Sequence, residues 1–266
     1  MSPSQSPVNC FVGMFDVIGF KALRAELGTP GLHQKYMRGI LPAIAHSAAG
    51  KGKHETINGQ SMYVPDFTGT TLKYRAISDS VLLLAPDDSF DSFCQLINSS
   101  FMLLQFGFNG GRAPFRGAIG WGDLIDDPQG ILLGSAIEDS YAGESQQAWA
   151  GAMLTSSARD IAEARGYIER FEQIHLEAAA IVPDEITKKN ALLNSKRLVR
   201  YAVPTQVNPK DGPAQYATLE TYAIDWTVRM YEGASQKSFE ESKSAHANTI
   251  AANTRSFETW ARAREV

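Results

Sequence analysis

The chain has 266 residues, of which 44% are hydrophobic, 10% aromatic and 20% charged, a composition typical of a globular protein that buries its core without disulfides. The net charge of −4 argues against a general nucleic-acid binder, and no apolar run approaches the length of about 18 residues that a membrane-spanning helix needs. The two cysteines, Cys10 and Cys94, form no zinc-binding pattern, and the polar N-terminus shows no secretion signal. We therefore expect a cytoplasmic protein without membrane insertion.

The first third of the chain predicts a strand, helices and a hairpin. Cys10–Gly19 is short, apolar and β-branched, which favours a buried strand, and Lys21–Leu27 predicts a helix that stops at a glycine. Leu32–Ala49 has apolar residues at helical spacing, whereas the polar, glycine-containing stretch Gly50–Gly59 indicates a loop. Thr71–Ala85 predicts two strands joined by a tight turn at Ser-Asp-Ser.

Helix and strand patterns continue to the end of the chain. Ser135 and Glu138 have the spacing of a capping box that opens a helix toward Trp149. Helical periodicity covers Phe90–Phe106, Ser156–Ile174 and Phe239–Arg264. Further strands are predicted at Phe115–Gly122, Gly130–Gly134, Met153–Leu154, Leu198–Val203 and Tyr216–Trp226.

This order of elements predicts an α+β fold with a ferredoxin-like core, in which a central, mostly antiparallel sheet is flanked by helices. We expect a catalytic core over residues 10–155 and a C-terminal extension of helices and strands over residues 156–266, packed on the same domain.

Two aspartates stand at positions suited to metal binding. Asp16 closes the first strand just before a glycine turn and a helix start, and Asp79 sits at the tip of the predicted hairpin. Such a carboxylate can hold Mg²⁺ or Mn²⁺ while the amides of Ile18–Phe20 face phosphates, and a second carboxylate would let two ions share the site. Taken alone, however, each aspartate is better explained by the turn in which it lies, because Asp bonds its own backbone there.

Three motifs in order resemble the catalytic domain of class III nucleotidyl cyclases. They are FDVIGF (Phe15–Phe20), YRAISDSV (Tyr74–Val81) and FRGAIGWG (Phe115–Gly122), and the likeness covers about Phe11–Thr155. The chain is still more similar to the pyrimidine cyclases of the bacterial Pycsar antiphage system, which carry Ser-Asp-Ser at the hairpin tip. In those proteins a segment like Gly134–Gly151 replaces the usual Asn/Arg motif.

The resemblance implies roles for individual residues. Asp16 and Asp79 become the catalytic residues that bind two divalent ions, Mn²⁺ or Mg²⁺, with the Val17 carbonyl as an additional ligand. Ile18, Gly19 and Phe20 become the triphosphate cradle.

Base recognition falls to residues near the same strands. Arg75, four residues before the second aspartate, stands where purine cyclases read the base and could donate to a pyrimidine carbonyl; a surface ion pair is the other interpretation. Met14 shares a strand face with Asp16 and forms either a pocket wall or core, and Tyr141 could stack or hydrogen-bond in the pocket. Arg116 is expected to be structural, pairing with a buried acid.

The chain departs from the purine cyclases at three positions. Glu138, Ala142 and Ile131 stand where that family has a ribose-contacting Asn, a transition-state Arg and a base-reading Asp. These departures argue against a plain adenylate or guanylate cyclase and leave the source of transition-state charge open.

The resemblance therefore implies a homodimeric lyase that converts UTP to 3′,5′-cyclic UMP and pyrophosphate for antiphage defence, where the product activates a separate effector protein. Cytidylate cyclase activity on CTP, an unusual purine cyclase and a degenerate nucleotide-binding or dimerisation module remain as alternatives. The sequence contains no P-loop, Rossmann glycine motif, histidine metal spacing or nucleophile elbow that would suggest another chemistry.

Overall fold

The computed structural model describes residues 6–41, 43–44, 52–57, 60–65, 71–111, 113–207, 215–228, 230 and 247–264. Its strands are β1 (Val8–Val17), β2 (Gly52–Ile57), β3 (Gln60–Pro65), β4 (Lys73–Ile77), β5 (Ser80–Leu84), β6 (Phe115–Asp126), β7 (Leu132–Leu133), β8 (Gly151–Leu154), β9 (Leu198–Val207) and β10 (Gln215–Ile224). Its helices are α1 (Phe20–Lys35), the π-helical turn η1 (Tyr36–Ile40), α3 (Phe90–Phe106), the π-helical turn η2 (Gly107–Gly111), α4 (Ser135–Gln146), α5 (Ser156–Ala164), α6 (Tyr167–Ile181), α7 (Glu185–Ser195) and α9 (Ala247–Ala263).

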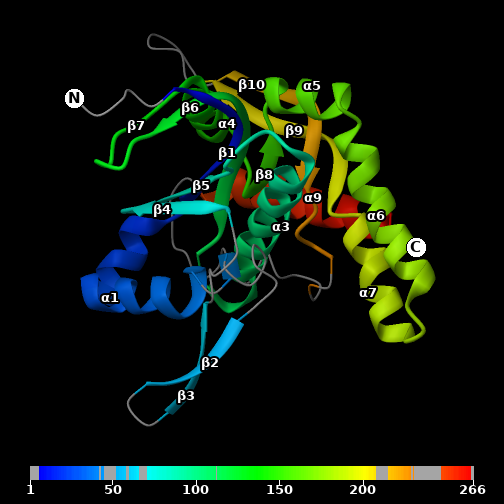
Figure 1. Cartoon of the computed structure of the whole chain (residues 1–266). Coiled ribbons are helices and arrows are strands. Elements are labelled where there is room, and N and C mark those ends of the chain that lie inside the picture. The colour runs from blue at the N-terminus through cyan, green and yellow to red at the C-terminus, as the bar shows by residue number, and fades with distance from the viewer. Residues whose placement is uncertain are drawn as a thin grey trace.

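Eight of these strands form one sheet in the order β4-β5-β1-β6-β8-β10-β9, with β7 paired to β6. Only β6 and β8 run parallel among these pairs. Helix α3 lies across one face of the sheet and α4 across the other, while the β2–β3 hairpin projects away from it (Figure 1). The predicted α+β class with a mostly antiparallel central sheet flanked by helices is therefore confirmed.

The alternation of side chains along β1 explains the two helical layers. Phe11 and Phe15 belong to the large core on the α3 side, and Cys10 and Val12 to a smaller cluster that includes Ala136 of α4. Because successive strand residues point to opposite faces, a strand with apolar residues at both odd and even positions needs a cover on each side.

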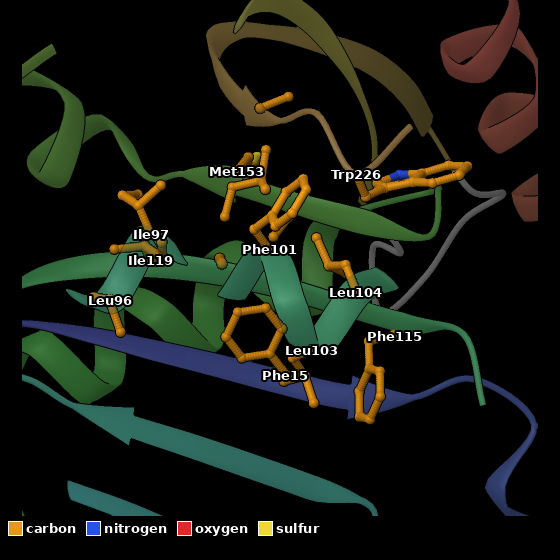
Figure 2. Close-up of a cluster of buried hydrophobic side chains, with 14 of the residues drawn as sticks. Phe15, Leu96, Ile97, Phe101, Leu103, Leu104, Phe115, Ile119, Met153 and Trp226 are labelled. Atoms are coloured by element: carbon orange, nitrogen blue, oxygen red, sulfur yellow. The ribbon is translucent and has the colours of Figure 1, made fainter. Parts of the chain in front are cut away.

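Helix α3 fills the larger core. Figure 2 shows its side chains, among them Leu96, Phe101 and Leu104, gathered with Phe15 and Phe115 of the strands. The helix starts where Ser89 caps it by accepting a hydrogen bond from the Ser92 amide (3.3 Å), a contact of the kind that stabilises a helix by about 1 kcal/mol. The predicted boundaries Phe90–Phe106 are confirmed.

The C-terminal part of the chain extends the same sheet. β10 pairs with β8 and with β9, and α9 is fastened to the segment before β8. Asn253 Nδ2 donates to the Ala148 carbonyl (2.7 Å), the Thr254 hydroxyl accepts from the Ala150 amide (2.8 Å), and the Trp149 and Phe257 rings lie 4.6 Å apart. The predicted division at residues 155 and 156 stays a prediction, although these contacts cross it.

Three predictions of local structure are wrong. Gly50–Gly59, predicted as a loop, contains strand β2, which pairs only with β3 among the described strands. The strand was not predicted because its sequence is mostly polar and charged. Ser156–Ile174 is two helices rather than one, because Gly166 adopts the left-handed conformation (φ 65°) and separates α5 from α6.

The third wrong prediction is the capping box. Gly134 holds the N-cap position, and Ser135 is already the first helical residue. The Ser135 hydroxyl accepts from the Asp123 amide (3.0 Å) and donates to the Asp123 carboxylate, so this serine ties the helix to β6 instead of capping it. The predicted helix over Phe239–Arg264 is α9 in its described part, and residues 231–246 lie outside the described residues.

Candidate active site

Asp16 and Asp79 line one pocket of about 420 Å³, which we name the carboxylate pocket. Its walls are the continuous segment from Asp16 to Ala22, together with Asp79, Arg116 and Ile250. The two aspartates line the same pocket because β1 pairs with β5. In this pairing Asp16 lies opposite Ser80, the residue next to Asp79. The sheet register thus brings together two carboxylates that are 63 positions apart in the sequence.

A sharp turn joins β1 to α1 at the edge of this pocket. Gly19 has φ 79°, a conformation that glycine adopts without a Cβ penalty, and α1 begins at the next residue, Phe20. The Ile18 amide donates to the Pro114 carbonyl (2.9 Å), so the expectation that it faces phosphates is wrong: it anchors the turn to the segment before β6. The Ala22 and Leu23 amides donate to the Gly19 carbonyl (3.0 and 3.1 Å), which leaves the Phe20 and Lys21 amides as the anion donors of the first turn of α1.

The hairpin tip, which we define as Ser78 and Asp79, is held from two sides. The Asp79 carbonyl accepts from the Val17 amide (3.1 Å), and the Ser78 carbonyl accepts from the Tyr36 hydroxyl (2.7 Å). Ser78 has φ 58°, which is unusual for a residue other than glycine.

The carboxylate pocket disfavours the charged form of Asp16. Burial, followed by the nearby Glu144 and Asp79, raises the pKa of Asp16 to about 7, although Arg116 and the Val17 amide act in the opposite direction. Burial also raises the pKa of Glu144, against the effect of Arg116. Burial and the two aspartates raise the pKa of Tyr36 to about 12, so its hydroxyl stays protonated and donates.

This charge distribution suits a divalent cation. Two carboxylates and a neighbouring backbone are the hard oxygen donors that Mg²⁺ and Mn²⁺ prefer, and a cation would offset both the burial and the repulsion that raise the pKa of Asp16. Within the described part of the chain, no cluster of three or more His, Cys, Asp or Glu side chains forms a metal site, so the protein would supply only a pair of carboxylates.

Two basic side chains also line the carboxylate pocket. Lys21 lies in the first turn of α1, and Arg116 lies on β6 opposite Asp16. Arg116 Nε donates to the buried Glu144 carboxylate (2.6 Å), which confirms the predicted pairing with a buried acid. Sequence reasoning did not assign Lys21 to the site, although its place one residue after the glycine–aromatic turn is a usable signal.

Sequence reasoning also missed Glu144, Tyr36 and Ile250 as neighbours of the carboxylates. They come from α4, η1 and α9, and no local pattern relates these elements to β1. Their approach is set by tertiary packing.

The remaining candidate residues lie elsewhere. Arg75 on β4 is 45% exposed and pairs with Asp126 (3.1 Å), which is the surface ion pair that the alternative interpretation expected. Met14 lies opposite Leu82 and Ala118, one strand repeat from Asp16, and does not line the carboxylate pocket. Tyr141 is 55% exposed on α4 and does not line the carboxylate pocket.

No described helix is long and apolar enough to cross a membrane. No family model matches the sequence, and no curated protein matches it.

Solved structures of cyclase domains show a distant likeness to the chain. The catalytic core of a rhodopsin-guanylyl cyclase with converted specificity, in complex with ATPαS, is 12% identical with a TM-score of 0.46, over 82% of this chain and 96% of that one. The guanylyl cyclase Cya2 is 12% identical with a TM-score of 0.41, over 82% and 92%. The monomeric guanylyl cyclase domain of the RhoGC fusion protein from the aquatic fungus Blastocladiella emersonii is 13% identical with a TM-score of 0.41, over 60% and 88%.

Proposed function

We propose that the protein is a nucleotidyl cyclase that converts UTP to 3′,5′-cyclic UMP and pyrophosphate. The observation that carries the proposal is the carboxylate pocket, in which Asp16 and Asp79 lie beside the glycine turn and the start of α1. A carboxylate pair next to a helix N-terminus suits a metal-bound triphosphate, because each part binds one half of that ligand.

The residues of the pocket have distinct tasks in this reaction. Asp16 and Asp79 hold the divalent ions, which when bound activate the ribose 3′-hydroxyl and neutralise the leaving phosphates. The side chains of Lys21 and Arg116 and the amides of Phe20 and Lys21 orient the triphosphate, so that the 3′-oxygen lies in line with the bond that breaks between the α-phosphorus and the β-phosphate oxygen.

The preference for a pyrimidine follows from the motif resemblance and from the residues at the purine-reading positions. Arg75 does not line the carboxylate pocket of its own protomer. We therefore propose that the enzyme is a homodimer in which Arg75 of one protomer contacts the base bound by the other, as closed two-fold symmetry allows. CTP is the alternative substrate, since a guanidinium can donate to the carbonyl of either pyrimidine.

The biological part of the proposal rests on the resemblance alone. The cyclic nucleotide would act as a second messenger in antiphage defence by activating a separate effector protein, and the enzyme would work in the cytoplasm. A degenerate cyclase-like module that only binds nucleotides or dimerises is the second candidate, favoured by the absence of an arginine at Ala142.

The test is incubation of the purified protein with UTP, CTP, ATP and GTP separately in the presence of Mn²⁺, with products identified by mass spectrometry. We expect cyclic UMP from the wild type, none from Asp16→Ala or Asp79→Ala, and unchanged product from Asp160→Ala, which removes an exposed aspartate on α5. A cyclic purine product would refute the base assignment. No cyclic product from any triphosphate would refute the enzyme and favour the binding module.

A further inference from the structure

Tyr36 reaches the hairpin tip from a distant part of the chain. It begins η1, directly after α1, and its ring lines a largely apolar pocket of about 440 Å³ beside the carboxylate pocket, together with Phe20 and Tyr74. Its hydroxyl donates a hydrogen bond to the Ser78 carbonyl (2.7 Å). The ring is therefore held by packing while the hydroxyl contacts the tip.

The hairpin tip needs external support. Only two residues separate β4 from β5, and the first of them, Ser78, has φ 58° where such turns favour glycine. A residue with a Cβ persists in this conformation only where its surroundings hold it. Among the described residues, two hydrogen bonds from outside the hairpin hold this tip, one to each central residue: the Tyr36 hydroxyl donates to the Ser78 carbonyl, and the Val17 amide donates to the Asp79 carbonyl.

These two bonds have different consequences for the carboxylates. The bond from Val17 joins the tip to the strand that carries Asp16, so it sets the separation of the two aspartates. The bond from Tyr36 comes from the helical layer and sets the orientation of the turn around that joint. With only one bond, the tip could pivot while remaining attached to β1.

We propose that Tyr36 is a positioning residue, whose hydroxyl fixes the turn at Ser78 so that the Asp79 carboxylate faces Asp16 across the carboxylate pocket. The inference rests on the proposed function in that it takes the aspartate pair to bind a divalent cation. A cation needs both carboxylates in one arrangement, and a fixed tip supplies that arrangement before binding.

The test compares Tyr36→Phe, which removes only the hydroxyl, with Tyr216→Phe as a control. Tyr216 is exposed on β10, which lies toward the opposite edge of the sheet from β4 and β5. Mn²⁺ binding is measured by electron paramagnetic resonance, and backbone mobility by hydrogen exchange with mass spectrometry. For Tyr36→Phe we expect Mn²⁺ binding about 2- to 10-fold weaker, the effect of one lost hydrogen bond, and faster exchange in peptides that span residues 73–84. Tyr216→Phe should match the wild type in both measurements.

Turnover gives a further readout. At limiting Mn²⁺ the rate of Tyr36→Phe should fall, and at saturating Mn²⁺ it should recover, because a positioning defect can be offset by the ion it impairs. A variant that binds Mn²⁺ as tightly as the wild type overturns the inference, even if its unfolding free energy is lower, since that result describes a merely structural role.

The two proposals fail in different ways. Wild-type protein that binds Mn²⁺ but forms no cyclic product refutes the cyclase, while weaker binding by Tyr36→Phe still supports the positioning role. Wild-type protein that binds no Mn²⁺ overturns both. Equal Mn²⁺ binding by wild type and Tyr36→Phe, with cyclic product formed, overturns the positioning role alone.

Discussion

Asp16 should make the metal-free protein less stable, and replacing it by its neutral isostere should show this. Its pKa in the folded protein is about 7 and its ordinary value is 3.8. At 1.36 kcal/mol per pKa unit, this difference corresponds to at most about 4 kcal/mol. Because the side chain is only partly buried, solvent reduces both the cost of burying the charge and the repulsion from its neighbours, and we expect a gain in unfolding free energy of about 1–2 kcal/mol for Asp16→Asn.

The sign of the effect depends on pH. A carboxyl whose folded pKa lies above its unfolded value costs nothing while both states are protonated, below about pH 4. The cost grows as the pH rises from there to about 7 and is constant above that. Asparagine carries no charge at any pH, so the advantage of Asp16→Asn should be full at pH 8 and much smaller at pH 4.5.

The assay is urea unfolding in the presence of a chelator at these two pH values. The control is Asp139→Asn, because Asp139 accepts hydrogen bonds from the Trp121 amide (3.2 Å) and from the hydroxyls of Thr155 and Ser157. Because the Asp139 carboxylate accepts these hydrogen bonds, Asp139→Asn should lower the unfolding free energy by about 1–2 kcal/mol. A variant Asp16→Asn that is no more stable than wild type at pH 8, or equally stabilised at both pH values, would refute the reasoning.

Three further predictions follow from the same geometry. Mn²⁺ affinity, measured by titration from pH 5.5 to 8, should be constant above the pKa of Asp16, which is about 7. Below that pH the affinity should fall by about tenfold per pH unit, because a proton must leave Asp16 before the ion binds. An affinity that does not change with pH would contradict this prediction. Glu144→Gln should move that acid limb to lower pH by removing a negative neighbour. It should also cost about 1–3 kcal/mol of unfolding free energy, because Arg116 loses its charged partner and keeps the Gln147 carbonyl. Gly134→Ala should be far more destabilising in urea unfolding than Gly130→Ala: both glycines have positive φ, but a Cβ at Gly134 would lie 2.1 Å from the Asp123 carbonyl oxygen, whereas nothing lies within 4 Å at Gly130. Equal losses would contradict the steric argument.

Local patterns were sufficient for the elements that carry the two aspartates. The apolar run that ends at Asp16 and the alternation around Asp79 predicted β1 and the β4–β5 hairpin, because one strand is buried on both faces and the others have a short polar turn between them. The pairing of β1 with β5 then brings both carboxylates to one pocket.

The rest depends on contacts that no local pattern encodes. Glu144 is one of several acids on a polar helix, and only the packing of α4 on the sheet selects it as the partner of Arg116. The capping-box prediction failed for a similar reason, because Ser135 hydrogen-bonds to Asp123 on the neighbouring strand β6 instead of capping its own helix. Strand β2 was missed because it contributes no apolar run.

The presence of Ile250 in the wall of the carboxylate pocket has a consequence for protein synthesis. Asp79 leaves the ribosome 171 residues before Ile250 does. At about 5–20 residues per second, a nascent chain spends roughly 10–35 seconds with both aspartates translated but one side of the pocket missing. Throughout this interval the carboxylate pocket lacks the part of its wall that Ile250 supplies, so the pocket is complete only after α9 has been translated and packed.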